Sequence, residues 1–146
     1  MREILLSLLT LLAPACAFAS DCTEMNGMWQ ATNQGNSMEY IYLNVGFEPV
    51  QHSLRIDYYY DANESIRSFS ETYIADGRQH DGDNVFTGIS YRASCENGAI
   101  TIVRNVQELS NPLHTKLRAA DRKLNFSSDN GGDSPVVTEI FVPRNF

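Results

Sequence analysis

Apolar and polar residues alternate along most of the chain after its leader-like start, and this two-residue period is the feature that most limits the fold. Side chains of a β-strand point alternately to its two faces, so alternation is typical of strands with one buried face. Residues 52–61 show it clearly, and their mostly apolar face comprises His52, Leu54, Ile56, Tyr58 and Tyr60. Residues 85–95, 99–106 and 113–119 follow the same pattern. The sequence therefore predicts an all-β fold.

Turn-forming residues separate these segments at intervals of about ten residues, which is the rhythm of an up-and-down antiparallel sheet. Asp76-Gly77 and Asn97-Gly98 are dipeptides typical of two-residue hairpin turns, because both central residues of such turns need a positive φ. An open sheet would leave long edges exposed, whereas closing it into a barrel removes them. We expect a single up-and-down antiparallel β-barrel of about 8–10 strands in residues 20–146, with an interior that is filled or holds one small ligand.

Residues 1–19 have the three parts of a secretory signal peptide. Arg2 gives a positive start, Ile4 to Leu12 form an apolar run, and Ala17-Phe18-Ala19 is an A-x-A cleavage pattern. The apolar run is shorter than the roughly 20 residues that a membrane span requires. We expect cleavage after Ala19 and an extracytoplasmic location, either periplasmic or secreted. A lipoprotein anchor at Cys16 is the alternative, but the residues before Cys16 fit that pattern poorly.

Two cysteines, Cys22 and Cys95, remain after the leader. An even pair in an oxidising compartment favours a disulfide. Two free thiols or half of a metal site are the alternatives, although no C-x-x-C spacing supports a metal site.

The net charge and the polar strand faces argue against two classes of partner. The formal net charge is −7. An acidic chain without a basic run repels phosphate backbones, so we expect no binding to nucleic acid. The polar faces formed by Ser53, Arg55 and Asp57, and by His114, Lys116 and Arg118, could not face lipid. We therefore do not expect the chain to span a membrane.

Two stretches resemble small exported lipocalin-like proteins of bacteria, whose functions are poorly known. Gly27-Met28-Trp29 resembles the G-x-W pattern that opens the first lipocalin strand, and residues 73–106 resemble a D-G-K-x-H to N-G-x-L-x-I-x-R pattern of the bacterial proteins. The resemblance implies a barrel in which Trp29 closes one end beneath an arginine of the last strand. Arg144 occupies a suitable position for a cation–π contact with that indole. Gly27, Trp29 and Arg144 are thus the expected closure residues.

Tyrosines at apolar strand positions suggest a semi-polar interior, because buried phenols need hydrogen-bond partners. Arg104 follows Ile100 and Ile102 on the predicted inward face, and an arginine beside a tyrosine can hold a carboxylate. We expect Tyr58, Tyr60, Tyr91 and Arg104 to be ligand-binding residues. The alternatives are that the tyrosines flank the rim or reflect strand propensity, and that Arg104 lies at the barrel mouth or is turned outward by a bulge.

Metal and catalytic motifs have little support. His80, Asp81 and Asp83 are close together, but they supply too few ligands for a calcium loop and fit a polar hairpin tip. No G-x-S-x-G elbow is present, and no free cysteine remains to pair with a histidine. We expect no metal, no cofactor and no catalytic residue. The sequons at Asn63 and Asn125 matter only if the source is eukaryotic.

Three hypotheses for function follow. The first is an exported barrel that binds a small, largely apolar or semi-polar ligand inside. The second is a protein-binding module, such as an exported hydrolase inhibitor, with a filled barrel. The third is an enzyme built on the same barrel.

Overall fold

A computed structural model of the chain describes residues 22–32, 42–60, 67–82, 89–107, 109–129 and 136–144. The predicted signal peptide with Cys16, the sequon at Asn63, and Asp83 lie outside these residues. Within them the structure consists of ten strands and one short 3-10 helix, and no helix there is long and apolar enough to span a membrane.

The elements follow one another along the chain without a crossover helix in the described residues. They are η1 (Cys22–Met25), β1 (Gly27–Ala31), β2 (Tyr42–Glu48), β3 (Ser53–Tyr59), β4 (Arg67–Ile74), β5 (Asp76–Asp81), β6 (Ile89–Glu96), β7 (Ala99–Val106), β8 (Leu113–Ala120), β9 (Lys123–Ser128) and β10 (Val137–Pro143).

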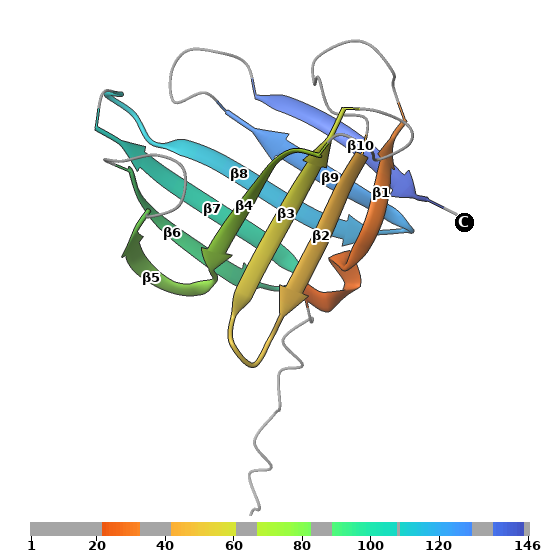
Figure 1. Ribbon diagram of the computed structural model, residues 1–146, viewed down its shortest axis with the longest axis horizontal. Coiled ribbons are helices and arrows are strands. Elements are labelled where there is room, and N and C mark those ends of the chain that lie inside the picture. Colours follow the sequence, from red (N-terminus) through yellow and green to blue (C-terminus); the bar gives the residue numbers. More distant parts are fainter. Residues whose placement is uncertain are drawn as a thin grey trace, which may run out of the picture.

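All ten strands belong to one antiparallel sheet with the order β4-β3-β2-β1-β10-β9-β8-β7-β6-β5. Strands β1 to β4 cross in front of β6 to β10, so the sheet folds over on itself (Figure 1). The first and last strands meet at its centre, where Trp29 of β1 pairs with Pro143 of β10. The two edge strands, β4 and β5, are consecutive in the chain but are not paired. The predicted up-and-down antiparallel β-barrel is confirmed as a nearly closed barrel of ten strands.

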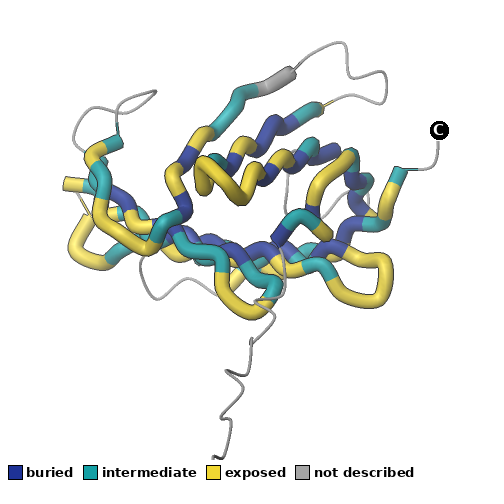
Figure 2. Tube along the Cα trace, turned by 90° about the horizontal axis from the view of Figure 1, so that it is seen from below, coloured by how far each residue is buried: buried dark blue, intermediate teal, exposed yellow. Residues whose placement is uncertain are grey.

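The core lies between the two layers and is built from the alternating apolar positions. Leu54 and Ile56 of β3 and Ile100 and Ile102 of β7 are completely buried. Buried positions alternate with intermediate or exposed ones along β7 and the first half of β3, and Figure 2 shows buried segments of the tube in both layers. Burying each such side chain contributes about 1.5–3 kcal/mol, so these inward rows are the main source of stability.

The two predicted hairpin turns have different outcomes. Asn97 and Gly98 have φ values of 51° and 69°, and Glu96 pairs with Ala99, which confirms a two-residue turn between β6 and β7. The prediction for Asp76-Gly77 is wrong, because β4 and β5 form no hairpin. Gly77, with a φ of 78°, instead lies in a β-bulge between Asp76 and Gln79, where the register of β5 against β6 shifts. A glycine suits either use, since it adopts positive φ without a steric penalty.

The N-terminal segment closes against the barrel through η1. The predicted disulfide between Cys22 and Cys95 is confirmed, with their Cα atoms 6.1 Å apart. Met25 is completely buried, and its carbonyl accepts a 2.8 Å hydrogen bond from Trp29 Nε1. The Asn26 amide binds both backbone groups of Phe47, so η1 is joined to β2 as well.

The residues expected to close the barrel lie close to this segment. Trp29 is buried in β1, and the backbone N–H of Arg144 donates to the carbonyl of Met28. The cation–π contact that the structure shows for Arg144 is with Tyr42, whose ring centroid lies 4.8 Å from Cζ. Gly27 has a φ of 131°, which explains a glycine at the start of β1. A closing role for Gly27, Trp29 and Arg144 together stays a prediction.

Candidate ligand-binding site

The most distinctive interior feature is an ion pair between Arg104 of β7 and Glu71 of β4. Arg104 Nη1 donates to Glu71 Oε1 at 2.9 Å, and the two side chains are only 20% and 12% exposed. Because β4 and β7 are not neighbours in the sheet, the two side chains can meet only across the interior, beside the gap between β4 and β5. Arg104 continues the inward row of Ile100 and Ile102, as the sequence predicts.

Tyr58 extends this ion pair into a cluster. Its hydroxyl donates to Glu71 Oε2 at 2.7 Å, so each oxygen of the carboxylate accepts a hydrogen bond. The Tyr58 ring stacks on Phe69, with the ring centroids 4.3 Å apart. The pairing of Tyr58 with Phe69 and of Ile56 with Glu71 places all four side chains on the same face of β3 and β4.

Thr115 of β8 is the second partner of Arg104. Its Oγ1 accepts a 2.7 Å hydrogen bond from Arg104 Nη2, and Thr115 is only 2% exposed. Arg104 Nε is buried and has no hydrogen-bond partner among the described residues. A buried donor without an acceptor costs about 1–3 kcal/mol, so the cluster has one unmet hydrogen-bonding demand.

Tyr91 of β6 borders the cluster at the gap between the sheet edges. Its hydroxyl accepts a 3.1 Å hydrogen bond from the backbone N–H of Ile74, at the end of β4. Its ring packs edge-on against the ring of Tyr73, with the centroids 5.0 Å apart. In the sheet, Tyr91 lies directly opposite Arg104 on the neighbouring strand β7. Tyr91 thus links the β4 edge to β6, the strand beside the other edge.

Burial and charge keep the phenols of the cluster protonated. Burial, and next the negative charge of Glu71, raise the pKa of Tyr58 well above its ordinary value. The same two causes raise the pKa of Tyr73. Burial lowers the pKa of the Arg104 guanidinium, because it disfavours the charged form. Electrostatic interactions with Tyr73 and Glu71 raise this pKa by more, so the pKa is raised overall. The cluster therefore contains one cation, one anion and neutral hydroxyl groups that can donate.

His80 of β5 lies on the other side of Tyr91. Its imidazole stacks on the Tyr91 ring with the centroids 5.4 Å apart, and its Nε2 lies 2.8 Å from Asp76 Oδ1. Hydrogen bonds from His80 and from the backbone N–H of Arg78 lower the pKa of Asp76. His80 is thus held against the cluster, and no group of three metal-ligating side chains occurs in the described part of the chain.

Three of the four residues expected at a ligand site come together. Tyr58 and Arg104 contact Glu71, and Tyr91 lies opposite Arg104. Tyr60 follows the end of β3 and is 39% exposed, so the structure does not bring it into the cluster. The strand period placed Tyr60 inward, but β3 ends at Tyr59 and the alternation does not continue beyond it.

Glu71 is the interior residue that the sequence analysis missed. A single glutamate in an acidic chain resembles a surface residue. The alternation of Phe69, Glu71, Tyr73 and Ala75 was the available signal, because it places this carboxylate in a row of apolar side chains.

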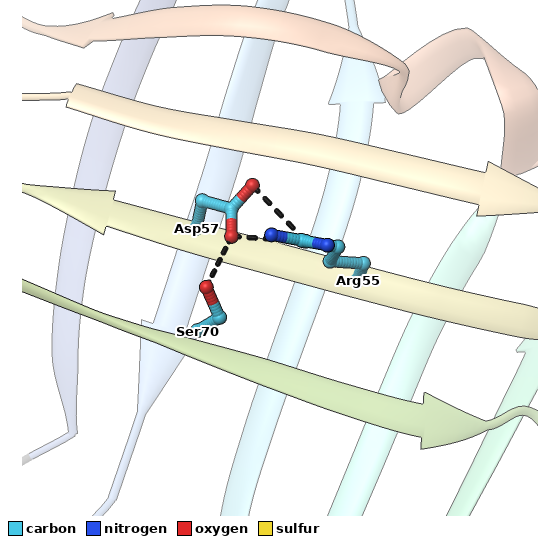
Figure 3. A network of polar contacts seen from close by, with 3 residues as sticks. All are labelled: Arg55, Asp57 and Ser70. Atoms are coloured by element: carbon cyan, nitrogen blue, oxygen red, sulfur yellow. Dashed lines mark hydrogen bonds and ion pairs between the residues drawn. The ribbon is translucent and has the colours of Figure 1, made fainter. Parts of the chain in front are cut away.

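A second polar network lies on the outer face of β3 and β4. Arg55 Nε donates to both carboxylate oxygens of Asp57, at 3.0 and 3.2 Å, and the Ser70 hydroxyl donates to one of them (Figure 3). The period predicts the outward direction of Asp57, yet Asp57 is only 5% exposed. Asp57 and Ser70 pair across the two strands, so this network fastens β4 to the sheet.

Known structures with this fold share little sequence with the chain. The fluorescent protein UnaG (wild type) has a TM-score of 0.62 at 10% identity, over 85% of this chain and 100% of that one. Lipid binding protein 8 (LBP-8) of Caenorhabditis elegans, in its apo form, has a TM-score of 0.60 at 12% identity, over 85% and 98%. The REP1-NXSQ fatty acid transporter has a TM-score of 0.58 at 12% identity, also over 85% and 98%.

No protein-family model matches the chain, and no curated protein matches its sequence. Identities this low show a shared fold, and a fold by itself does not establish a function. The chain therefore shares its up-and-down β-barrel fold with solved proteins named for binding lipids or transporting fatty acids.

Proposed function

We propose that the protein is an exported, bacterial, lipocalin-like barrel that binds a small, largely apolar ligand in its interior. Residues 1–19 would act as the signal peptide, and residues 20–146 would form the binding domain. Tyr58, Tyr91 and Arg104 would contact the polar end of the ligand. The disulfide between Cys22 and Cys95 is compatible with an oxidising compartment outside the cytoplasm.

One observation carries the proposal, namely the Arg104–Glu71 pair inside a mostly apolar barrel interior. Taking two charges out of water is expensive, and apolar side chains of similar volume often stabilise a fold as well or better. The sheet therefore has no structural need for these charges. A ligand with an apolar body and a polar end would use both parts of such an interior, as small-molecule sites generally do.

The structural relatives support the same class of ligand. Two of them are named for lipid binding or fatty-acid transport, and both cover 85% of this chain. This support comes from the fold, so the interior cluster remains the specific argument for this chain.

A binding experiment on residues 20–146 tests the proposal. The protein would be unfolded to remove bound lipid, refolded with its disulfide, and titrated with the neutral apolar fluorophore N-phenyl-1-naphthylamine. We expect saturable binding of one molecule per chain. Amide chemical-shift changes should concentrate at inward positions such as Tyr58, Ala93 and Arg104, and should spare outward positions such as Arg92 and Lys116. Absence of saturable binding, or changes confined to outward positions, would contradict the proposal.

Native mass spectrometry of protein purified from its own source gives an independent readout. A co-purifying small molecule is the expected result. If a protein partner co-purifies in stoichiometric amount and the fluorophore does not bind, the protein-binding alternative with a filled barrel would be favoured instead.

A further inference from the structure

The charge of Arg104 is already balanced inside the barrel. Glu71 lies 2.9 Å from Nη1, Thr115 accepts from Nη2, and Tyr58 donates to the remaining oxygen of Glu71. A free arginine in an apolar interior attracts carboxylates, because a guanidinium and a carboxylate match in charge and geometry. Here a side chain of the protein occupies the position that a carboxylate ligand would take.

A carboxylate ligand would therefore meet an energetic obstacle. If it displaced Glu71 from Arg104, the Glu71 anion would be left in a mostly buried site with neutral tyrosine hydroxyls, that of Tyr58 among them, and without its cation. If it bound beside the intact pair, its negative charge would lie next to that of Glu71. Both outcomes are unfavourable, because an uncompensated charge in a low-dielectric interior is poorly stabilised.

An uncharged polar group meets no such obstacle. Arg104 Nε is a buried donor with no partner in the described residues, and an oxygen that reached it would satisfy it. Tyr91 lies opposite Arg104 on the neighbouring strand, and its hydroxyl accepts from Ile74 while keeping its own proton to donate. Both Arg104 Nε and the Tyr91 hydroxyl are donors that need an acceptor oxygen, and this oxygen does not have to carry a negative charge.

We propose that Glu71 sets the head-group specificity of the barrel, so that it binds apolar molecules ending in an uncharged oxygen group, such as a hydroxyl, and discriminates against carboxylates of the same chain length. This inference rests on the proposed interior ligand site. It names the chemical class of the ligand and assigns the selection to one side chain.

A pair of matched ligands tests this inference. Displacement of N-phenyl-1-naphthylamine by 1-dodecanol and by dodecanoate at pH 8 would give two dissociation constants for each protein. We expect wild type to bind the alcohol at least tenfold more tightly. Any apolar interior disfavours a charged ligand to some extent, so the decisive quantity is how the ratio of the two constants changes with Glu71→Gln.

Glu71→Gln leaves the charge of Arg104 unbalanced, and it should shift the ratio toward dodecanoate by at least tenfold. Glu96→Gln is the matched control, because Glu96 is exposed at the end of β6, and it should leave the ratio unchanged. An unchanged ratio in Glu71→Gln would overturn the inference, as would wild type binding dodecanoate as tightly as the alcohol. Failure of the fluorophore and both ligands to bind would instead overturn the proposed interior site itself.

A measurement on wild type covers the case in which Glu71→Gln does not fold. The carbonyl carbon of [1-13C]dodecanoic acid reports its ionisation through its chemical shift. Beside the Arg104–Glu71 pair, any bound acid should stay protonated to a higher pH than free acid does. A bound acid that ionises at lower pH than free acid would show direct pairing with Arg104 and would overturn the inference, whereas binding of the alcohol without the acid would support it.

Discussion

Arg122 shows how a single residue can oppose the backbone conformation that its turn requires. Asp121 and Arg122 connect β8 to β9 in a two-residue turn, with φ values of 52° and 59°, and Ala120 pairs with Lys123 on either side. Residues other than glycine, asparagine and aspartate pay a steric cost in this left-handed region, since Cβ approaches the following carbonyl oxygen. The Asn97-Gly98 turn avoids this cost at its second position.

Arg122→Gly should raise the free energy of unfolding by about 0.5–1 kcal/mol. Relief of the left-handed conformation, worth about 1–2 kcal/mol, outweighs the extra chain entropy that a glycine loses on folding. Urea unfolding followed by circular dichroism would measure the change. Lys123→Gly is the matched control, because Lys123 is an exposed residue of β9, and it should destabilise the protein instead. Equal losses in both variants would contradict the argument.

At this scale the sequence predicted the inward direction of Tyr58, Tyr91 and Arg104, because direction depends only on a local two-residue period. It did not predict the partner of Arg104. Glu71 is 33 residues away in the chain, and only the closed sheet brings the two side chains together. Residues 119–123 were expected to form a longer turn, and the two-residue form at Asp121-Arg122 was not predicted, because these residues lack the Asn-Gly or Asp-Gly signature.

The edge strands β4 and β5 are the elements between which the sheet does not close. Unpaired strand edges normally expose backbone groups that invite association with other chains. Here the Tyr91 hydroxyl of β6 accepts a hydrogen bond from the Ile74 N–H at the end of β4. The N–H of Ala75 donates to the His52 carbonyl at 2.7 Å and extends the pairing of β3 with β4 by one residue. The Tyr91 side chain thus satisfies one backbone donor at the β4 edge.

Tyr91→Phe should speed the hydrogen exchange of the Ile74 amide, because the variant lacks the hydroxyl that accepts this N–H. We expect a rate increase on the order of tenfold, corresponding to a hydrogen bond worth about 1 kcal/mol. Exchange measured by NMR resolves single amides. The Ala75 amide serves as an internal control, since its acceptor is a backbone carbonyl, and its rate should not change. Equal acceleration at both amides would indicate general loosening instead.

At the scale of elements, the alternation and the turn spacing predicted the strands and the pairing of consecutive ones, but they could not predict where that pairing is interrupted. Asp76-Gly77 has the local signature of a hairpin, and a bulge uses the same positive φ. The choice between turn and bulge depends on whether β4 or β6 is the better partner for β5. The pairing partner of β5 depends on how the whole sheet closes, and a short segment of sequence does not determine this closure.

On the scale of the whole molecule, the disulfide joins η1 to the end of β6 over a sequence separation of 73 residues. Such a cross-link reduces the conformational freedom of the unfolded chain, by about 4 kcal/mol for a loop of this length in the chain-entropy model. Together with buried Met25 and Trp29, it holds the N-terminal segment against the sheet.

The double variant Cys22→Ala with Cys95→Ala should therefore lose about 4 kcal/mol of stability relative to the oxidised wild type. Guanidinium unfolding, with and without reductant for wild type, would measure this loss. Reduced wild type should match the variant closely. Complete alkylation of both thiols in the native protein without prior reduction would contradict the disulfide directly.

The buried phenols give the whole molecule a characteristic response to alkaline pH. The pKa values of Tyr58 and Tyr73 are raised in the folded state, whereas unfolded tyrosines titrate near pH 10. Their contribution to stability is thus fully present below about pH 10 and is lost as the pH rises further, because only the unfolded state releases these protons.

Unfolding in urea between pH 8 and pH 11 should show a decline above about pH 10 with a slope of up to about 1.4 kcal/mol per pH unit for each such phenol. Tyr58→Phe should make that slope shallower, because it removes one of the two groups. A stability that does not vary over this range, or a slope that Tyr58→Phe leaves unchanged, would contradict the prediction.

The pairing of β1 with β10 has a consequence for the order in which the protein can be assembled. Ala31 pairs with Phe141, so the middle of the sheet cannot form until nearly the whole chain has left the ribosome. The hairpins of β2 with β3 and of β6 with β7 have no such requirement, since each uses residues close together in sequence. In an exported chain Cys95 would reach the oxidising compartment before Phe141, so the disulfide could tether the first segment before its strand has a neighbour. The pairing of β1 with β10 should therefore form late in folding, because it joins the first and last strands of the sheet.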